Sequence, residues 1–249
     1  YLFGEFSKTG WWYYFPVAFL IKTPVALLAM LAGGLVLVCA QWRRLLETPI
    51  YILLPPIVIV GLSMTQKLNI GLRHILPVYP LMLMLCAVAV AWLLRRGQRF
   101  IVVAGIVLIA GEFAAAYPSP LAFFNVFVGG PRHGDECLVD SNLDWGQDLK
   151  GLKRWMDAND VKHINLCYFG TADPTYYGID CTHLPGSLIM ERGAPPQLPG
   201  FVAISATNLR GVYFSEPARQ FYRPFLSMKP VARIGYSIFV YQVERPWWQ

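Results

Sequence analysis

Four long apolar runs occupy most of the first 117 residues, and they constrain the fold more than any other feature of the sequence. Each run is close to the roughly 17 to 25 residues that cross a bilayer core as a helix. The whole chain is also more apolar than an ordinary soluble domain, since 55% of its 249 residues are hydrophobic and only 14% are charged. We therefore expect an α-helical integral membrane part with four transmembrane helices. These helices are predicted over residues 24–40, 49–65, 75–94 and 100–117.

A change in composition near residue 117 predicts a domain boundary. Residues 1–117 carry nine Lys and Arg against three Asp and Glu, whereas residues 118–249 carry twelve of each and contain no long apolar run. The net charge of +6 therefore lies in the membrane half. A basic balance of this kind reflects membrane topology and contact with anionic lipids, and it does not indicate a nucleic-acid partner.

The arginines that follow the first and third runs predict the orientation. These arginines are Arg43, Arg44, Arg95, Arg96 and Arg99. Because positively charged loops stay in the cytoplasm, we expect the start of the chain, loop 66–74 and residues 118–249 on the extracytoplasmic side of the cytoplasmic membrane. The sequence opens without an initiating Met or a signal peptide, so we also expect it to be the C-terminal part of a longer protein.

Residues 118–249 have the periodicities of a small α/β domain. The segments "ECLVDSN", "HINLCYFG" and "GFVAISATN" are predicted strands, "DWGQDLKGLKRWMDAND" is a predicted helix, and "VARIGYSIFVYQVE" is either one long strand or a terminal strand pair. The order strand, helix, strand implies a crossover connection and at least partly parallel pairing. The expected fold is thus a transmembrane part, residues 1–117, followed by a soluble extracytoplasmic α/β domain, residues 118–249.

Four basic side chains are predicted on the extracytoplasmic side of the membrane, where Lys and Arg are rare. They are Lys8, Lys67, Arg73 and His74. An Arg guanidinium binds a phosphate through two parallel hydrogen bonds and a Lys ammonium binds it as a point charge, so these residues are candidates for holding a phosphate. The alternative is that they bind phospholipid head groups or extend to the membrane surface.

The segments "YLFGEFSKTGWWYYFPVAFLIKTPVALL" and "KLNIGLRHILPVYPLML" resemble the C-terminal membrane part of bacterial type C glycosyltransferases. That group includes protein O-mannosyltransferases and lipid A aminoarabinose transferases. The resemblance covers residues 1–117, and N-x-G-x-R-H-x-x-P-x-Y-P is its most specific motif. It implies an enzyme of the bacterial inner membrane that passes a sugar from a polyprenyl-phosphate donor to a lipid, protein or glycan acceptor outside the cytoplasm.

The resemblance also implies roles for the loop that follows the second apolar run. It implies that Arg73, His74 and Lys67 face the donor phosphate, while Asn69 and Gly71 shape the loop. No cofactor is expected, and a divalent metal is left open.

The catalytic carboxylate is not expected within this sequence, because in the resembled family it lies in the first outer loop, many spans upstream. Glu5 is the one acidic residue in the outer loops of residues 1–117, and it is a weak candidate for the base. The resemblance implies that Glu5 and Lys8 belong to an outer loop near the active-site cavity. Glu5 also fits a helix-start or interfacial role. Glu112 lies inside the last apolar run, where a carboxylate is either functional or simply paired.

The motif "DSNLDWGQDLKGL" leaves three interpretations of Asp144 open. In the first, Asp144 caps the following helix and Gln147 completes a capping box. In the second, the loop binds a polar acceptor, because ligands favour the carboxyl ends of parallel strands. The third is a calcium loop that begins with Asp140, Asn142 and Asp144, but other residues replace the Gly and Glu that such a loop requires.

Five cysteines divide between the two halves. Cys39 and Cys86 lie in apolar runs and are expected to pack there. Cys137, Cys167 and Cys181 lie on the oxidising side, where one pair can form a disulfide that the spacing alone does not identify.

A second class of function fits the same architecture. A membrane-anchored ligand-binding or transport protein would also carry an outer α/β recognition domain. Transport favours buried charges in several spans, and Glu112 is the only charged residue within the four apolar runs. The glycosyltransferase is therefore the leading hypothesis. Its expected substrate-binding residues are Lys8, Lys67, Asn69, Arg73, His74 and Asp144.

Overall fold

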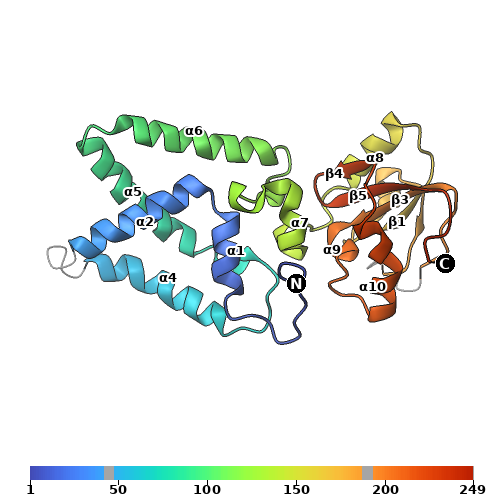
Figure 1. The fold of residues 1–249 in the computed structure, drawn as a ribbon, viewed down its shortest axis with the longest axis horizontal. Helices are drawn as coiled ribbons and strands as arrows, with labels where there is room; N and C mark the ends of the chain where they lie inside the picture. The colour runs from blue at the N-terminus through green and yellow to red at the C-terminus, as the bar shows by residue number, and fades with distance from the viewer. Residues whose placement is uncertain (42–47, 187–192, 249) are drawn as a thin grey trace. The chain divides into compact units, whose positions relative to one another are not determined.

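Contacts within the chain divide it into two compact units. The computed structural model describes residues 1–41, 48–186 and 193–248 (Figure 1). Ser7–His133 form one unit, here called the helical unit, and Tyr1–Phe6 together with Gly134–Gln249 form the other, here called the sheet unit. The boundary expected from composition, after residue 117, lies inside the helical unit.

The first six residues belong to the sheet unit. Leu2 is buried. The backbone N–H of Phe3 donates to the carbonyl of Cys137 at 2.9 Å, and the hydroxyl of Tyr1 donates to the carbonyl of Glu136 at 3.2 Å. The sheet unit is therefore completed by a segment that composition assigns to the membrane half.

Helices of almost continuous apolar sequence make up the helical unit. Backbone polar groups inside a bilayer must pair within their own segment, so a single apolar run of this length is stable there as a helix. Apolar helices occupy all four predicted ranges, and one further helix precedes them. Their bounds are α1 Tyr14–Lys22, α2 Val25–Ala40, α4 Thr48–Met64, α5 Val78–Arg95 and α6 Arg99–Ala116. The 3₁₀ turns are η1 Leu72–Ile75, η2 Pro120–Ala122, η3 Val126–Val128 and η4 Pro131–His133.

Among the described residues, two helices, α5 and α6, are each long and apolar enough to cross a membrane. Helices α1 and α2 meet the same standard only as a pair, with a bend of 115° between them. Helix α4 is apolar but shorter, and it contains Pro55 and Pro56. Val103 and Ile106 on α6 are more than half exposed, as expected for a surface in contact with lipid. In the part of the chain that is described, the helical unit thus contains two helices that could span a membrane, or three if the bent pair counts as one span.

The chain bends where the sequence predicts the first span to begin. Thr23 is extended (φ −109°, ψ 134°) and Pro24 has no N–H, so the helical hydrogen bonds stop here. Asn125 donates hydrogen bonds to the carbonyl groups that the interrupted helix leaves without a partner. Its side-chain amide donates to Leu20 at 2.6 Å and to Thr23 at 2.9 Å, and its backbone N–H donates to Ile21 at 2.9 Å. Non-helical backbone is tolerated at membrane depth where protein groups pair with it in this way.

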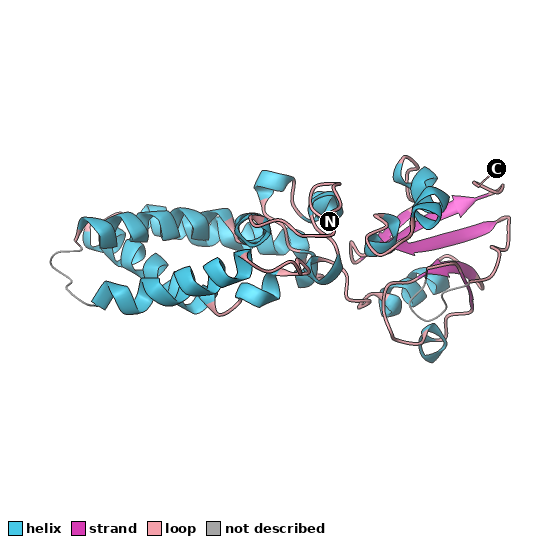
Figure 2. Ribbon diagram, turned by 90° about the horizontal axis from the view of Figure 1, so that it is seen from below, coloured by secondary structure: helices cyan, strands magenta, loops and turns pink. Residues whose placement is uncertain are grey.

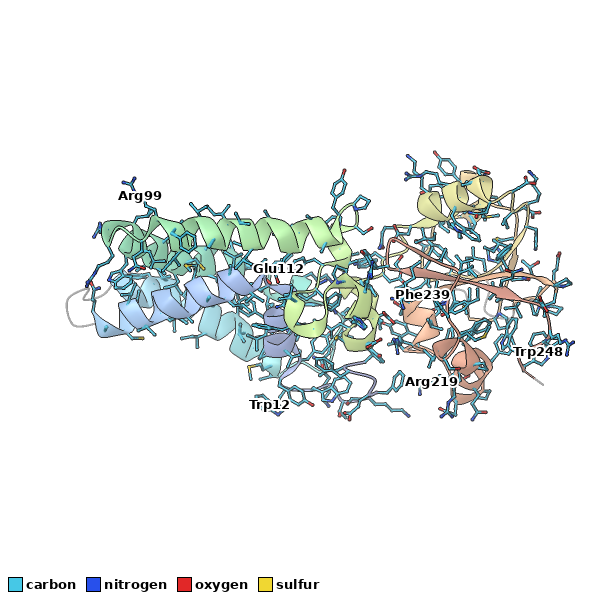
Figure 3. All side chains as sticks on the ribbon, turned by 45° about the horizontal axis from the view of Figure 1, so that its top comes forward. Trp12, Arg99, Glu112, Arg219, Phe239 and Trp248 are labelled. Atoms are coloured by element: carbon cyan, nitrogen blue, oxygen red, sulfur yellow. The ribbon has the colours of Figure 1, made fainter. Side chains whose placement is uncertain are left out.

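The carboxylate of Glu112, a residue labelled in Figure 3, pairs with two backbone N–H groups, one at the start of α2 and one after α6. This carboxylate is buried, with Oε2 accepting the N–H of Val25 at 2.9 Å and Oε1 accepting the N–H of Val126 at 3.2 Å. Val25 is the first residue of α2, where the helix dipole favours a negative charge. Of the two roles expected for Glu112, the structure shows the paired one, because the carboxylate caps α2 and ties it to the segment after α6.

Helices α2 and α5 approach each other closely at Gly34. A Cβ atom at this position would lie 2.0 Å from the carbonyl oxygen of Leu85. At the neighbouring Gly33, a Cβ would meet the Cβ of Ala89 at 3.5 Å, which is an ordinary contact. Small residues allow helix backbones to approach in this way. Gly34 therefore fixes the spacing of α2 and α5.

A mixed sheet forms the core of the sheet unit (Figure 2). In the described residues the strand order is β2-β1-β3-β5-β4, with β1 parallel to both β2 and β3, and β5 antiparallel to both β3 and β4. The predicted partly parallel pairing is confirmed, but the crossover predicted between residues 136–142 and β1 is not formed, because residues 136–142 are not a strand. The strand bounds are β1 Ile164–Cys167, β2 Cys181–His183, β3 Gly200–Ser205, β4 Ala232–Ile234 and β5 Ile238–Val243.

Helix α8, Leu149–Ala158, packs on the sheet. Its buried residues Leu149, Leu152 and Met156 recur at the spacing of one helix face, and they share a core with Leu166 and Val240. The other helices are α7 Gly134–Cys137, α9 Ala206–Leu209 and α10 Glu216–Tyr222, and the 3₁₀ turns are η5 Asp140–Asn142, η6 Pro174–Tyr177 and η7 Arg223–Leu226.

The prediction of a strand over residues 136–142 is wrong. This segment contains the end of α7 and the turn η5. Asp140 has a left-handed φ of 56°, which an extended strand does not accommodate. The terminal segment is the strand pair β4 and β5, one of the two alternatives predicted for it.

All five cysteines lie in the described residues and are free. Cys137 and Cys167 are buried, and burial raises the pKa of their thiols to about 11 and about 12. The disulfide expected among Cys137, Cys167 and Cys181 is therefore not formed.

Candidate functional site

Two loops of the helical unit pack against each other through Asn69. Its side-chain oxygen accepts the backbone N–H of Trp11 at 2.6 Å, and its amide group donates to the carbonyl of Gln66 at 3.5 Å. Gly10 has a φ of 76°, and a Cβ there would lie 2.5 Å from the Asn69 oxygen and 2.7 Å from the carbonyl oxygen of Lys67. Glycine suits both the backbone conformation and the close approach. Asn69 thus joins loop 66–74 to the loop before α1.

His74 lies on η1, directly after Arg73, and turns one ring nitrogen into the protein. Its ring packs edge-on against Phe15, with the centroids 5.9 Å apart and the planes at 72°. The Nε2 atom of His74 is buried, and no hydrogen bond to it is formed by the residues that the structure describes. Arg73, by contrast, is exposed. Since buried polar atoms are nearly always hydrogen-bonded, Nε2 of His74 is a candidate contact for a ligand.

An apolar cavity of about 700 Å³ lies among α1, α2, α4, η1 and α5. Its walls include Phe15 from α1, Leu35 from α2, Ile57 from α4, Ile75 from η1 and Met82 from α5. Cavities of about 300 to 1,000 Å³ commonly hold small ligands. Because every lining residue is apolar, a hydrocarbon group is the occupant that fits.

The apolar cavity ends at the polar loop. Phe15 and Ile75 line it, and they are respectively the ring partner and the chain neighbour of His74. Lys67 and Arg73 belong to the same loop as His74, and both are exposed. The structure therefore places the apolar cavity next to His74, on the loop that also carries Lys67 and Arg73.

Glu5 and Lys8 belong to different units. Lys8 is exposed on the loop that Asn69 holds in the helical unit. Glu5 belongs to the sheet unit, where it is exposed and its backbone pairs with Leu2. The role that the structure shows for Glu5 is to close a turn of the sheet unit.

Asp144 is fully buried in the sheet unit and joins two chain segments. Its Oδ1 accepts the N–H of Gly146 at 3.1 Å, and its Oδ2 accepts the N–H of Thr207 at 3.3 Å. Thr207 lies in the first turn of α9, where N–H groups have no partner within the helix. Burial raises the pKa of Asp144 to about 7, although the two N–H donors act to lower it.

The prediction that Asp144 caps α8 is wrong. Helix α8 begins at Leu149 and has no side-chain cap. Gly146, with a φ of 72°, turns the chain between Asp144 and the helix. Gln147 accepts the N–H of Trp145 at 2.7 Å and completes no capping box. The calcium interpretation gains no support either, because no cluster of three or more His, Cys, Asp or Glu side chains in the described ranges could hold a metal ion.

Comparisons with protein-family models, with curated proteins and with solved structures find no match to this chain. A function for this chain is therefore inferred from the residues and geometry of the two units. The most informative geometry is the polar loop at the end of the apolar cavity.

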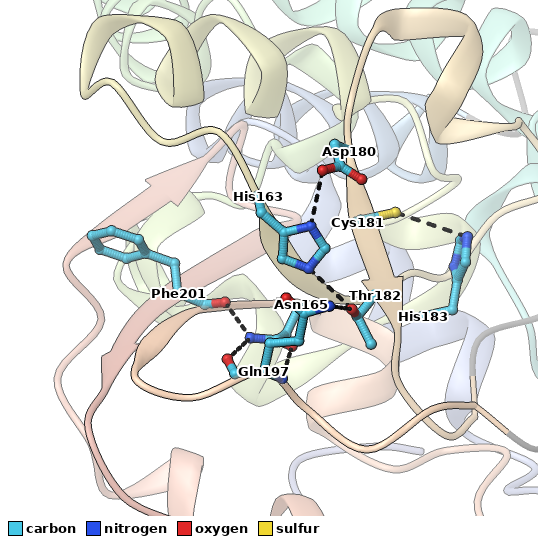
Figure 4. Close-up of polar contacts among 8 residues, drawn as sticks. All are labelled: His163, Asn165, Asp180, Cys181, Thr182, His183, Gln197 and Phe201. Carbon is cyan, nitrogen blue, oxygen red and sulfur yellow. Dashed lines mark hydrogen bonds and ion pairs between the residues drawn. The ribbon is translucent and has the colours of Figure 1, made fainter.

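A hydrogen-bonded network surrounds the edge strand β2 (Figure 4). His163 contacts Asp180 through Nδ1 at 3.1 Å and the Thr182 hydroxyl through Nε2 at 2.9 Å. An acid, a histidine and a hydroxyl joined in this way resemble the catalytic triad of a hydrolase. However, the Asp180 side chain is 77% exposed, whereas the acid of such a triad is buried. Gln197 donates its side-chain amide to Thr182 at 3.1 Å and its backbone N–H to the buried Asn165 at 2.7 Å. The network therefore fastens β2 and the segment before β3 to β1.

A buried ion pair joins α7 to the end of α9. Nε and Nη2 of Arg210 both donate to Oδ2 of Asp135, at 3.0 and 2.5 Å. The Asp135 side chain is 5% exposed, so this charge depends on its partner for compensation. The sequence analysis missed this pair because the two residues are 75 positions apart and no local pattern connects them.

Proposed function

We propose that the protein is a membrane glycosyltransferase with the type C architecture, which transfers a sugar from a polyprenyl-phosphate donor to an acceptor outside the cytoplasm. The observation that carries this proposal is the apolar cavity of about 700 Å³ that ends at a loop bearing Lys67, Arg73 and His74. A polyprenyl phosphate has the matching chemistry, because its hydrocarbon tail needs an apolar space and its phosphate needs cations. The resemblance of "KLNIGLRHILPVYPLML" to that family supports the same function.

Each residue of the loop has a distinct part in this proposal. The Arg73 guanidinium donates two parallel hydrogen bonds to the phosphate, Lys67 adds a second positive charge, and Nε2 of His74 forms a single hydrogen bond. During transfer, the acceptor oxygen bonds to the anomeric carbon as the bond from that carbon to the phosphate oxygen breaks. The cations stabilise the negative charge that remains on the phosphate.

The proton lost by the acceptor goes to a carboxylate base, which the resemblance places in a loop N-terminal to residue 1. Glu112 is not assigned to this step, because it is buried and its two oxygens bind the backbone at the start of α2 and after α6. The same bonds weaken the competing hypothesis of a transport protein, which relied on Glu112 as an intramembrane functional charge. The acceptor is a lipid, a protein or a glycan.

The proposal includes four spans in the bacterial inner membrane, with loop 66–74 and the sheet unit outside the cytoplasm. Single cysteines test this topology in a protein whose five native cysteines are replaced. Cysteines at the exposed positions Leu68 and Lys150 are expected to react with an impermeant thiol reagent in intact spheroplasts. A cysteine at the exposed Gly97 is expected to react only after lysis, because Arg95, Arg96 and Arg99 keep that loop inside. Labelling of residue 97 before lysis would reverse the orientation.

Arg73→Lys in the full-length protein is expected to slow sugar transfer at least about tenfold, because Lys keeps the charge but loses the paired hydrogen bonds. Arg99→Lys is the matched control, since Arg99 is an exposed arginine at the start of α6 (Figure 3) and is expected to tolerate the change. The measurement is the transfer rate from a polyprenyl-phosphate-linked sugar in membranes with matched expression. Equal rates for wild type and Arg73→Lys would exclude Arg73 from phosphate binding and favour lipid head groups as its partner.

A further inference from the structure

Three aromatic residues belong to the segments that meet where the parallel strands β1 and β3 end. Phe169 follows β1, and Tyr213 follows α9, the helix after β3. Their rings stack with the planes at 6° and the centroids 5.9 Å apart. Tyr213 is 57% exposed, and Trp145, on the loop before α8, is 54% exposed. Trp145, Phe169 and Tyr213 are together named the aromatic edge.

Close contacts hold the backbone next to Trp145 against the backbone of Phe169. The residue after Trp145, Gly146, packs so tightly that a Cβ there would lie 2.8 Å from the carbonyl oxygen of Phe169. The hydroxyl of Tyr168 donates to the carbonyl of Gly146 at 2.5 Å, and the N–H of Trp145 donates to the side chain of Gln147 at 2.7 Å. The backbone that carries Trp145 is therefore positioned without a ligand.

A carboxylate adjoins the stacked rings. Asp140 accepts the hydroxyl of Tyr213, and its backbone N–H donates to the hydroxyl of Thr207 at 3.0 Å. Asp140 also has a left-handed φ of 56°, a conformation that is costly outside glycine and is concentrated at ligand-binding sites. The surrounding segment, residues 137–149, contains three Asp and no Lys or Arg. The aromatic edge therefore combines ring faces with hydrogen-bond acceptors in an acidic setting.

We propose that the aromatic edge binds a neutral saccharide chain. A pyranose ring has a face of C–H groups, which packs on the negative face of an aromatic ring, and a rim of hydroxyls, which hydrogen-bond to carboxylates and amides. Trp145 and Tyr213 supply the ring faces, and the Asp140 carboxylate, which adjoins Tyr213, supplies the polar partner. A neutral ligand fits this surface better than an anionic one, because the carboxylate of Asp140 adjoins the ring of Tyr213. The proposal does not depend on sugar transfer by the helical unit.

Binding to defined oligosaccharides tests the proposal. The purified chain in detergent micelles is titrated separately with cellohexaose, mannohexaose and chitohexaose, and binding is followed by saturation-transfer NMR. At least one of them is expected to bind with a dissociation constant of about 1 mM or tighter. Trp145→Ala and Tyr213→Ala are each expected to weaken that binding at least about tenfold, because each removes one ring face.

Trp248→Ala is the matched control. Trp248 is an exposed aromatic residue that follows β5, and β5 ends beside Gly200, at the opposite end of β3 from the aromatic edge (Figure 3). This variant is expected to bind as wild type does. Tyr213→Phe keeps the ring and loses only the bond to Asp140, so its affinity is expected to stay within about threefold of wild type. It also separates loss of the site from misfolding in Tyr213→Ala.

Three results would overturn the proposal. The first is that none of the three saccharides binds, and the second is that Trp145→Ala binds as tightly as wild type. The third is quenching of Trp145 fluorescence by brominated lipids in nanodiscs, measured as the difference between wild type and Trp145→Phe, because it would place the aromatic edge on a bilayer surface. Saccharide binding with the expected variant pattern supports the proposal even if Arg73→Lys leaves sugar transfer unchanged, so the two proposals fail separately.

Discussion

Gly34→Ala is expected to destabilise the helical unit by at least about 3 kcal/mol, the upper end of what overpacking usually costs. A Cβ at this position would lie 2.0 Å from the carbonyl oxygen of Leu85. That oxygen belongs to the backbone of α5, so it cannot rotate away as a side chain would. Helices α2 and α5 must therefore separate, and the separation loses dispersion contacts along the rest of their interface.

Gly33→Ala is the matched control on the same helix. A Cβ at Gly33 would meet the Cβ of Ala89 at 3.5 Å, an ordinary van der Waals contact. Alanine also favours a helix over glycine by about 0.5 to 1 kcal/mol, so this variant is expected to be neutral or slightly stabilising. Thermal unfolding of both variants in detergent micelles, followed by circular dichroism, distinguishes them. Equal midpoints would show that α2 and α5 do not pack through Gly34.

The stability of the sheet unit is expected to fall as the pH rises from about 4 to about 7, because of Asp144. Burial raises the pKa of this carboxyl from 3.8 to about 7 in the folded protein. Between these two values the unfolded chain has released the proton while the folded protein keeps it. The folded state then binds more protons, so a rise in pH favours unfolding. The difference in pKa corresponds to a loss of about 4 kcal/mol, which is complete above the folded pKa.

Asp144→Asn removes this titration and keeps the shape of the side chain. Its free energy of unfolding, relative to wild type, is expected to rise by about 4 kcal/mol between pH 4 and pH 8, because wild type loses that amount over the interval. Urea unfolding of the purified chain in detergent, followed by tryptophan fluorescence at each pH, gives the two free energies. A difference that stays constant with pH would contradict the raised pKa of Asp144.

The positions of α2, α4, α5 and α6 follow from the apolar runs to within a few residues, because a backbone inside lipid must pair within its own segment. The bend between α1 and α2 does not follow from them. The groups that satisfy the bend come from later in the chain, with Glu112 87 positions beyond Val25 and Asn125 102 positions beyond Thr23. A window of one helix length contains neither partner, so the sequence predicts only that a span begins at residue 24.

The sheet unit and the candidate site were predictable to different degrees. The apolar residues of the two strands β1 and β3 make them predictable. The turn at Gly146 delays the start of α8 to Leu149, so Asp144 does not cap this helix as predicted. In the helical unit, Lys67, Arg73 and His74 could be selected from the sequence because basic side chains are rare in loops predicted outside the cytoplasm. The apolar cavity beside them could not be predicted, because its walls come from five elements whose packing is set by long-range contacts.

Pro55 and Pro56 give α4 a property that the other helical walls of the apolar cavity lack. Neither proline has an N–H, so two backbone hydrogen bonds are missing in the middle of this helix. Pro56 itself lines the cavity. By contrast, α2 is held against the backbone of α5 at Gly34. Of the helices that line the cavity, α4 is therefore the one that bends most readily, and in the proposed function a bulky hydrocarbon tail would gain room by displacing this helix sideways.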